Sequence, residues 1–190
     1  MWNINGSENT HTGKFVKLDL LDVTYPNGNT WKYEAVSRMW SNHTVWALIE
    51  NTTHNTLLLI EQYRPIPDKN IIELVAGICW DATDLTNEQN MRKEIHEESG
   101  YVKQNIKLVL ENIHKSPGLT AEMEDLYHAT VTWARWPQQL QWNEDITVHE
   151  FPKQDLNQFL ASKIKEGCGI SSWVYAIIGA LHSRWIDILS

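Results

Sequence analysis

Three glutamates near the middle of the chain have the spacing of a cluster that could hold a metal ion. Glu94, Glu97 and Glu98 stand at i, i+3 and i+4, so a helix across them places all three carboxylates on one face. Like charges this close repel one another unless a cation lies among them. Oxygen ligands suit Mg²⁺ or Mn²⁺, and Mg²⁺ also takes water and substrate phosphates into its shell. The pattern predicts a metal site that meets a phosphate-bearing substrate, against the simpler alternative of a solvated helix face.

The flanking residues predict a helix under these glutamates, over about residues 86–99. Thr86 has the position of an N-cap, and Gln89 is placed to reach back to it in a capping box. Gly100 is placed to end the helix in a left-handed conformation. An apolar segment at 71–75 and a glycine-containing turn precede the helix. This order favours a built site over a plain amphipathic surface helix.

The same stretch resembles the Nudix box, the signature of hydrolases that act on nucleoside diphosphates linked to another group. The matching residues are Glu73-Leu74-Val75-Ala76-Gly77 and Glu94-Ile95-His96-Glu97-Glu98-Ser99-Gly100-Tyr101. Lys93 stands where the family usually has arginine, and the segment from Gly77 to Lys93 is about two residues longer than usual. Thr83 or Asp84 falls where the family has a glutamate. All three helical carboxylates are nevertheless present.

The resemblance implies a hydrolase that depends on Mg²⁺, with Mn²⁺ as the alternative metal. Glu94, Glu98 and the main-chain carbonyl of Ala76 would hold the metal. Glu97 would lie nearby as a further ligand and catalytic group. The metal would offset the negative charge that otherwise repels an attacking water.

Two acidic loops could supply the general base for that water. Ser116–Glu122 resembles the loop that approaches the scissile pyrophosphate in ADP-ribose pyrophosphatases, which implies Glu122 as the base or as an added metal ligand. The pair Glu144-Asp145, just before a strand expected at 146–151, is the competing candidate. Related enzymes differ in which loop supplies the base, so both remain open, with Glu122 preferred.

Other segments resemble the ADP-ribose pyrophosphatase branch of the family. The matching segments, which extend the resemblance to most of residues 13–185, are Gly13–Leu18, Trp31–Arg38, Gln62–Pro65 and Phe151–Leu156. In that branch two aromatic side chains sandwich the adenine, one from each subunit of a homodimer with exchanged N-terminal segments. Phe15 and Tyr33 are the implied aromatics here. Glu34 would bind the edge of the base, while Arg38 and Arg64 would contact phosphate.

Composition limits the class of protein. A chain of 190 residues with 42% hydrophobic residues fits one well-cored soluble domain. The net charge of −8 argues against nucleic acid or an anionic membrane as the partner. Cys79 and Cys168 are too few for a disulfide framework, which indicates a reduced, cytoplasmic protein. The polar N-terminus shows no secretory signal, and the longest apolar run, at 173–181, is far shorter than the ~20 residues that span a bilayer.

The order of expected elements predicts an α+β protein. Strands are expected at 15–20, 30–38, 45–49, 57–60, 106–113, 126–133 and 146–151, and further helices at 153–165 and 172–188. The resemblance implies the Nudix fold, in which mixed β-sheets lie between helices (α/β/α). We expect a flexible tail over 1–12, an N-terminal β region over 13–40 for dimer and substrate contacts, and a catalytic domain over 41–190.

The expected reaction is hydrolysis of the pyrophosphate bond of a nucleoside diphosphate sugar, first of all ADP-ribose to AMP and ribose 5-phosphate. A UDP-sugar diphosphatase is the alternative within the same fold, and that branch can carry lysine at the Lys93 position. The alternative from another class is a catalytically silent sensor that binds a nucleotide sugar. Retention of Glu94, Glu97, Glu98 and Glu122 favours the enzyme, because a sensor does not need them.

Overall fold

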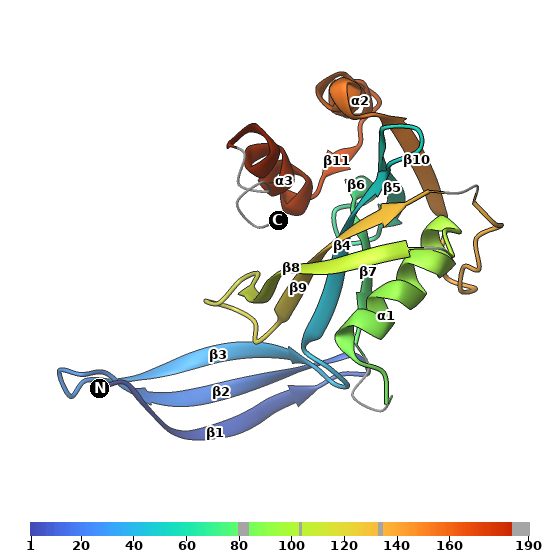
Figure 1. Cartoon of the computed structure of the whole chain (residues 1–190). Helices are drawn as coiled ribbons and strands as arrows, with labels where there is room; N and C mark the ends of the chain where they lie inside the picture. The colour runs from blue at the N-terminus through green and yellow to red at the C-terminus, as the bar shows by residue number, and fades with distance from the viewer. Residues whose placement is uncertain (80–83, 103, 133–134, 184–190) are drawn as a thin grey trace. The chain divides into compact units, whose positions relative to one another are not determined.

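The computed structural model describes residues 1–79, 84–102, 104–132 and 135–183. The described elements before residue 87 are strands, and Figure 1 labels the strands and helices in chain order. The strands are β1 (Asn3–Thr12), β2 (Val16–Thr24), β3 (Thr30–Arg38), β4 (His43–Asn51), β5 (Thr56–Arg64), β6 (Lys69–Glu73), β7 (Val75–Ile78), β8 (Gln104–His114), β9 (Met123–Val131), β10 (Ile146–Pro152) and β11 (Gly169–Ile170). The helices are α1 (Asn87–Glu94), a π turn (Ile95–Ser99), a 3-10 turn (Lys153–Asp155), α2 (Leu156–Lys165) and α3 (Ser172–Ser183).

These elements form two compact units, and each unit is discontinuous in sequence. Unit 1 comprises Met1–Thr44, Ile78–Asp84 and Glu111–Asp125, and unit 2 comprises Val45–Gly77, Leu85–Leu110 and Leu126–Ser190. The chain passes from one unit to the other within β4, β7, β8 and β9. The regions that the sequence suggested, with boundaries after residues 12 and 40, do not coincide with these units.

Unit 1 is built on a three-stranded antiparallel sheet in the order β1-β2-β3. A tight turn joins β2 and β3 into a hairpin: Tyr25 N–H donates to Asn29 O at 2.8 Å, and Gly28 takes φ +86°. Glycine suits this position because a positive φ strains residues that carry a Cβ.

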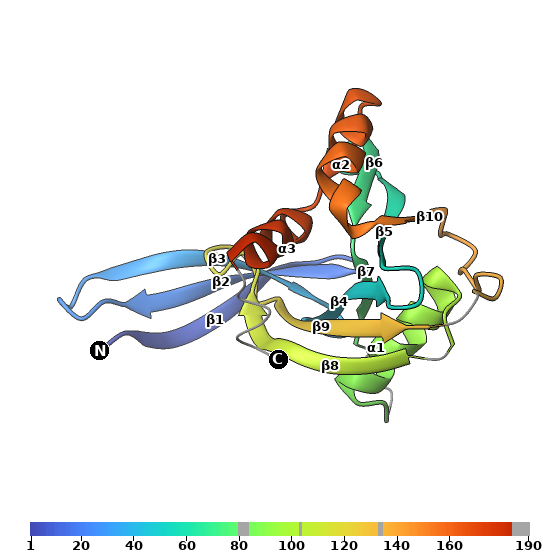
Figure 2. The same ribbon diagram turned by 45° about the horizontal axis from the view of Figure 1, so that its top comes forward.

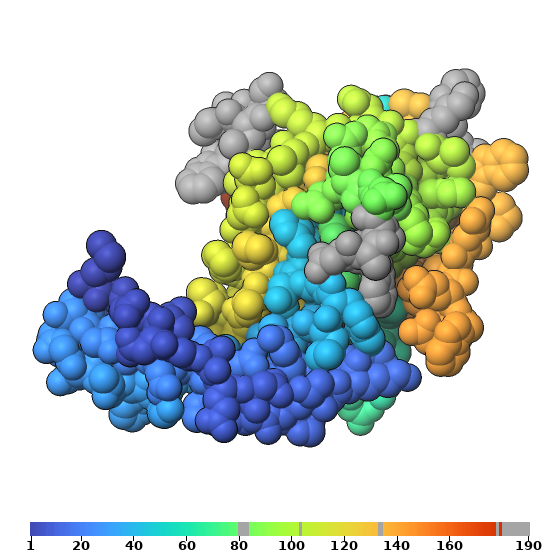
Figure 3. Space-filling view, turned by 90° about the horizontal axis from the view of Figure 1, so that it is seen from below, coloured from blue at the N-terminus to red at the C-terminus, as the bar shows by residue number. Residues whose placement is uncertain are grey.

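Strand β1 corrects the expectation of a flexible tail over residues 1–12. It pairs with β2 from Asn3↔Thr24 to Thr12↔Lys17, and every residue of β1 is exposed, as the dark blue surface in Figure 3 illustrates. Asn9 Nδ2 donates to Asp19 Oδ1 at 2.9 Å, and Thr10 Oγ1 donates to Leu18 O at 3.0 Å. A polar composition suggested disorder because it offers little apolar burial, but main-chain pairing with β2 supplies the order instead.

The larger sheet has the strand order β11-β6-β5-β4-β9-β8, and β10 also pairs with β5. The pairings of β4, β6 and β10 with β5 are antiparallel, whereas β11 lies parallel to β6. Residues 45–49 of β4 and 57–60 of β5 are buried, as their continuous apolar runs predict. They form much of the core of unit 2.

Helices complete unit 2 after β10. α2 packs beside β10 and β11, and α3 packs beside β6 (Figure 2). Phe159 of α2 stacks on Phe151 of β10 with ring centroids 4.3 Å apart. The helix predicted at 172–188 is observed to Ser183, and its remainder, like Trp133 at the end of the strand predicted at 126–133, lies outside the described residues. Within the described part of the chain, none of the helices has the length and apolarity needed to cross a membrane.

Candidate functional site

The predicted acidic helix is present and has the predicted caps. Thr86 Oγ1 accepts from Gln89 N–H at 3.2 Å, and Gln89 Oε1 accepts from Thr86 N–H at 2.8 Å, which completes the capping box. Gly100 ends the helix with φ +78°. The sequence did not predict that α1 widens into a π turn after Glu94. Such turns interrupt α-helices frequently at functional sites.

Two of the three helical glutamates are buried. Glu94 is 8% exposed and Glu98 is 5% exposed, while Glu97 is half-buried. The main-chain N–H of Ala76 donates to Glu98 Oε2 at 3.3 Å, so the segment Val75–Gly77 lies against the helix, as the motif implied. These contacts bring Ala76, Glu94 and Glu98 together within unit 2.

Gly77 permits this close approach. A Cβ on residue 77 would lie 2.5 Å from Glu94 Oε1 and closer still to Cγ and Cδ of the same side chain. Real Cβ atoms do not come so near, so any larger residue would displace Glu94. The sequence motif includes Gly77 without showing why. The structure shows that a side chain at this position would occupy the space of the Glu94 carboxylate.

The electrostatics of these carboxylates show a shortage of positive charge. The pKa of Glu94 is raised to about 7, mainly by burial and also by the charges of Glu97 and Glu144, against the opposing charge of Lys93. Burial and the charge of Glu94 raise the pKa of Glu98 well above its ordinary value. Lys93 Nζ lies 2.8 Å from Glu97 Oε2 and 3.5 Å from Glu94 Oε1. A single lysine therefore serves several carboxylates.

This donor set fits a hard divalent cation. In the described part of the chain, no three His, Cys, Asp or Glu side chains already stand in a metal-binding arrangement. Glu94 and Glu98 nevertheless offer buried carboxylate oxygens whose raised pKa values would fall on binding a cation. The residues present thus match the expected magnesium chemistry.

The raised pKa values predict an unusual pH dependence for the metal-free protein. The folded-state pKa of Glu94 exceeds the ordinary 4.5, so the folded state holds more protons than the unfolded state between pH 4.5 and about 7. The free energy of unfolding in EDTA should therefore rise as pH falls through this window. Each pKa unit is worth about 1.4 kcal/mol, so the gain from Glu94 is at most about 3 kcal/mol.

Urea unfolding in EDTA at pH 8 and pH 5.5 measures this effect, and Glu94→Gln should flatten it. Glu50 acts in the opposite direction but at lower pH, because hydrogen bonding to His128 and Lys153 holds its pKa at about 2. Its contribution is lost only as pH falls from 4.5 towards 2. A wild-type protein whose free energy of unfolding in EDTA is no higher at pH 5.5 than at pH 8 would contradict the prediction.

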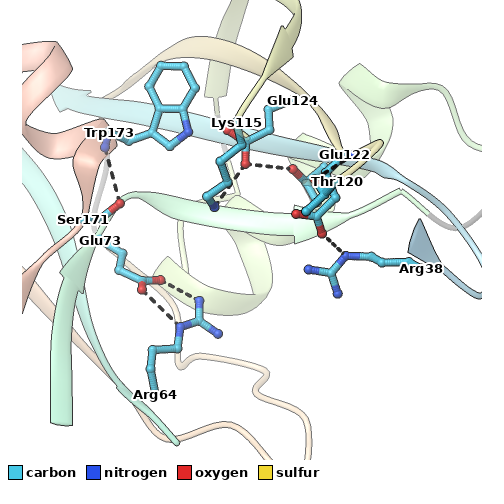
Figure 4. A network of polar contacts seen from close by, with 10 residues as sticks. Arg38, Arg64, Glu73, Lys115, Thr120, Glu122, Glu124, Ser171 and Trp173 are labelled. Carbon is cyan, nitrogen blue, oxygen red and sulfur yellow. Dashed lines mark hydrogen bonds and ion pairs between the residues drawn. The ribbon is translucent and has the colours of Figure 1, made fainter. Parts of the chain in front are cut away.

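Arg64, expected to contact phosphate, has a protein partner. Arg64 Nε and Nη2 bind Glu73 Oε1 and Oε2 at 3.1 and 2.5 Å, a bidentate pair shown in Figure 4. The Arg64 side chain is 42% exposed, whereas Glu73 is buried. Burial lowers the pKa of Arg64, but Glu73, Glu98 and Glu144 together raise it. The guanidinium is thus oriented by Glu73 and partly exposed, and the charges of Glu98 and Glu144 act on it.

Glu144, the competing candidate base, belongs to the same unit as the acidic helix. Its charge contributes to the raised pKa of both Glu94 and Glu98. Its carboxylate accepts from Gln141 N–H at 2.8 Å, and the neighbouring Asp145 is exposed. The structure therefore brings together Glu94, Glu98, Glu144 and Arg64.

The preferred candidate base, Glu122, lies in unit 1 and is engaged by Arg38. The two side chains form an ion pair, and Glu122 N–H donates to Thr120 Oγ1 at 3.1 Å (Figure 4). Tyr33 OH donates to Gly118 O at 2.8 Å, and Val36 N–H donates to Leu119 O at 2.9 Å. The loop at 116–122 is thus fastened to β3. The sequence suggested separate roles for Arg38 and Glu122 and did not reveal their pairing.

The remaining predicted substrate contacts also lie in unit 1. Phe15 is 59% exposed and meets Trp40 edge-on, with ring centroids 5.6 Å apart. Glu34 is exposed on β3, where it pairs with Leu20 of β2, and Tyr33 is 38% exposed beside it. These side chains are accessible, as ligand contacts must be. Thr83 or Asp84 stands where the family has a glutamate, and of these two Thr83 lies outside the described residues.

Comparison with known proteins gives the fold and two sequence relatives. No protein-family model matches the chain. It is 32% identical over 123 residues to a methanol dehydrogenase activator of Bacillus methanolicus, covering 65% of this chain and 63% of that protein's length. It is 24% identical over 157 residues to an ADP-ribose pyrophosphatase of Bacillus subtilis (strain 168), covering 82% of this chain and 81% of the relative.

A crystal structure of an ADP compounds hydrolase superposes with a TM-score of 0.66 at 15% sequence identity. The superposition covers 84% of this chain and 83% of the hydrolase. The chain therefore has the mixed α+β, Nudix-like fold that the sequence predicted.

Proposed function

We propose that this protein is a Mg²⁺-dependent hydrolase of the pyrophosphate bond in nucleoside diphosphate sugars, with ADP-ribose as the first substrate to test. The observation that carries the proposal is the pair of buried glutamates, Glu94 and Glu98, at the end of a capped helix with too little positive charge to balance them. The fold and one sequence relative, an ADP-ribose pyrophosphatase, support it.

In this proposal the carboxylates hold the cation and the chain positions the substrate around it. Glu94, Glu98 and the Ala76 carbonyl are the ligands, and Glu97, restrained by Lys93, lies beside them. When bound, Mg²⁺, or Mn²⁺ in its place, would supply charge that offsets that of the phosphate oxygens. Arg64 would orient one phosphate, since Glu73 already fixes the direction of its planar guanidinium.

The chemical step is an in-line attack of water on one phosphorus. A carboxylate accepts the water proton, the bond from that phosphorus to the bridging oxygen breaks, and ADP-ribose yields AMP and ribose 5-phosphate. We assign the base to Glu144 because it acts electrostatically on Glu94 and Glu98, whereas Glu122 is already paired with Arg38.

This assignment predicts different effects for the two acidic loops. Glu144→Gln should lower kcat by about 10²–10⁴-fold, the usual contribution of a general base. Glu122→Gln should lower it by less than about 10-fold, because Glu122 then acts only through Arg38. Steady-state hydrolysis of ADP-ribose by both variants measures the ranking, and the reverse order would assign the base to Glu122.

The contacts to the nucleoside are proposed from the resemblance. Phe15 and Tyr33 would stack on the base, Glu34 would bind its edge, and Arg38 would contact phosphate. We also propose a homodimer in which the N-terminal β regions are exchanged. The resemblance is the basis for both the contacts and the dimer. The accessibility of these side chains in unit 1 is the supporting observation.

Hydrolysis of ADP-ribose, ADP-glucose and UDP-glucose in Mg²⁺ or EDTA tests the function. Release of AMP that requires Mg²⁺ supports the proposal, and faster cleavage of UDP-glucose supports the alternative of a UDP-sugar diphosphatase. No product from any of the three would reject the hydrolase.

A second candidate is a regulator that binds a nucleotide sugar without cleaving it. The relative that is 32% identical is a methanol dehydrogenase activator, which favours this candidate. Calorimetry with ADP-ribose in Mg²⁺, with product measured in parallel, separates the two functions. Binding without product, together with stimulation of an added methanol dehydrogenase, would favour the regulator.

A further inference from the structure

The end of the acidic helix is hydrogen-bonded to the loop between β9 and β10. The last carbonyls of a helix have no partner within it and must be satisfied elsewhere. Here Glu97 O accepts from Gln139 N–H at 2.9 Å, and Gly100 O accepts from Trp136 N–H at 2.9 Å. A Cβ on Gly100 would collide with Trp136 O, so glycine permits this contact as well as the left-handed turn. The loop therefore serves as the partner of the π turn.

Gln138 is the side chain that extends this connection to the sheet. Its Nε2 donates to Glu98 O at 2.6 Å and to Ile146 O at 3.1 Å. A primary amide has two N–H donors, so both are used and both carbonyls are satisfied. Gln138 is half-buried although its neighbours Pro137 and Gln139 are exposed. One amide thus joins the acidic helix to the first residue of β10.

Glu144 lies on the short segment between these two attachments. Glu144 N–H donates to Gln141 O at 3.0 Å, while Gln141 N–H donates to Glu144 Oε2 at 2.8 Å, so the carboxylate belongs to a closed turn. On the other side, Ile146 pairs with Gln62 of β5. The position of the Glu144 carboxylate relative to Glu98 consequently depends on the bridge that Gln138 makes.

We propose that Gln138 is a positioning residue, whose amide holds the Glu144 turn in register with the acidic helix through Glu98 O and Ile146 O. The catalytic effect of Gln138 rests on the proposed function. The hydrogen-bonded link from Gln138 to Glu98 O and Ile146 O does not depend on that function. Leucine at position 138 keeps the volume and removes both donors. Glutamate keeps the shape and turns an acceptor towards two carbonyls.

The matched control is Gln139→Leu, since Gln139 binds Glu97 O through its main-chain N–H, which the substitution keeps. This control loses only the exposed contact of Gln139 Nε2 with His96 Nε2 at 3.4 Å. In Gln138→Leu and Gln138→Glu, kcat should fall about 10–100-fold, the cost of misplacing a catalytic group by about 1 Å. KM should change less than about threefold, because the proposed phosphate contacts are unaltered. Hydrogen exchange at the Trp136 and Gln139 amides should accelerate in both variants and not in the control.

A double-mutant cycle identifies the residue through which Gln138 acts. In the Glu144→Gln background, Gln138→Leu should cause no further loss of kcat. The same loss in both backgrounds, or a wild-type kcat in Gln138→Leu, would overturn the inference. If the wild-type protein cleaves no nucleotide sugar, the proposed function fails while hydrogen exchange still decides the mechanical link. Unchanged exchange at both amides in Gln138→Leu would reject that link.

Discussion

Glu98→Gln is expected to lower turnover of ADP-ribose by about 10²–10⁴-fold while leaving the metal-free protein folded and more stable. Charge stabilisation by a metal is worth several kcal/mol, and each 1.4 kcal/mol is about tenfold in rate. A neutral amide is a poorer ligand for Mg²⁺ than a carboxylate. Stability should rise because Glu98 is 5% exposed, beside Glu94, and its carboxylate is costly to keep charged there.

Two measurements separate the effects of Glu98→Gln. Hydrolysis at limiting and saturating Mg²⁺ reports the loss of catalysis, and thermal unfolding in EDTA and in Mg²⁺ reports the metal-free gain and the lost response to metal. Glu88→Gln is the matched control, because Glu88 lies on the same helix but is exposed and paired with Arg92. Full activity of Glu98→Gln at limiting Mg²⁺ would show that Glu98 is not a metal ligand.

Gly77→Ala is expected to abolish the response of the protein to Mg²⁺, although alanine adds only one methyl group. That methyl would occupy the space of the Glu94 side chain, which is itself buried and has little room to move. Overpacking of this kind typically costs about 1–3 kcal/mol. Glu94 would have to leave its position beside Ala76 and Glu98, so activity should fall together with metal affinity.

Titration of Mg²⁺ into the metal-free protein, followed by thermal shift, measures the effect of Gly77→Ala. Gly6→Ala in β1 is the control, since a Cβ there meets no atom within 4 Å. An unchanged Mg²⁺ response in Gly77→Ala would show that Glu94 can relocate without cost. It would also show that the close approach of residue 77 is a packing detail.

The sequence predicted the structural features that depend on residues close together in the chain. The capping box at Thr86 and the left-handed Gly100 are decided by residues next to one another in the chain. The π turn is not, because its unpaired carbonyls find partners in a loop about forty residues later, as with Gln138 and Glu98 O. Polar loop residues such as Gln138 carry no pattern that distinguishes a bridge from a solvated side chain.

The pairing of Arg38 with Glu122 shows the same limit for charged residues. The two are 84 positions apart, and each has a reason of its own to be assigned to substrate. Arg64 with Glu73 is similar, although the separation is only nine positions. Neither pair follows from strand register, because Glu122 precedes β9, and Arg64 lies opposite Lys69 while Glu73 lies opposite Ile60. The long side chains meet only in the folded arrangement of strands and loops.

The division of the chain into interleaved segments has a consequence for how this protein can be cut and recombined. Each unit contains three stretches of sequence. Four of the five crossings fall inside strands, and the fifth, between Asp84 and Leu85, falls just before α1. No single cleavage releases an intact half: a fragment beginning at residue 41 would keep Glu122 but lose Arg38, its ion-pair partner. The N-terminal sheet therefore cannot be exchanged between relatives as one independent sequence segment, because unit 1 also contains residues 78–84 and 111–125. Changes in this sheet must therefore arise by substitutions within a chain that folds as a whole.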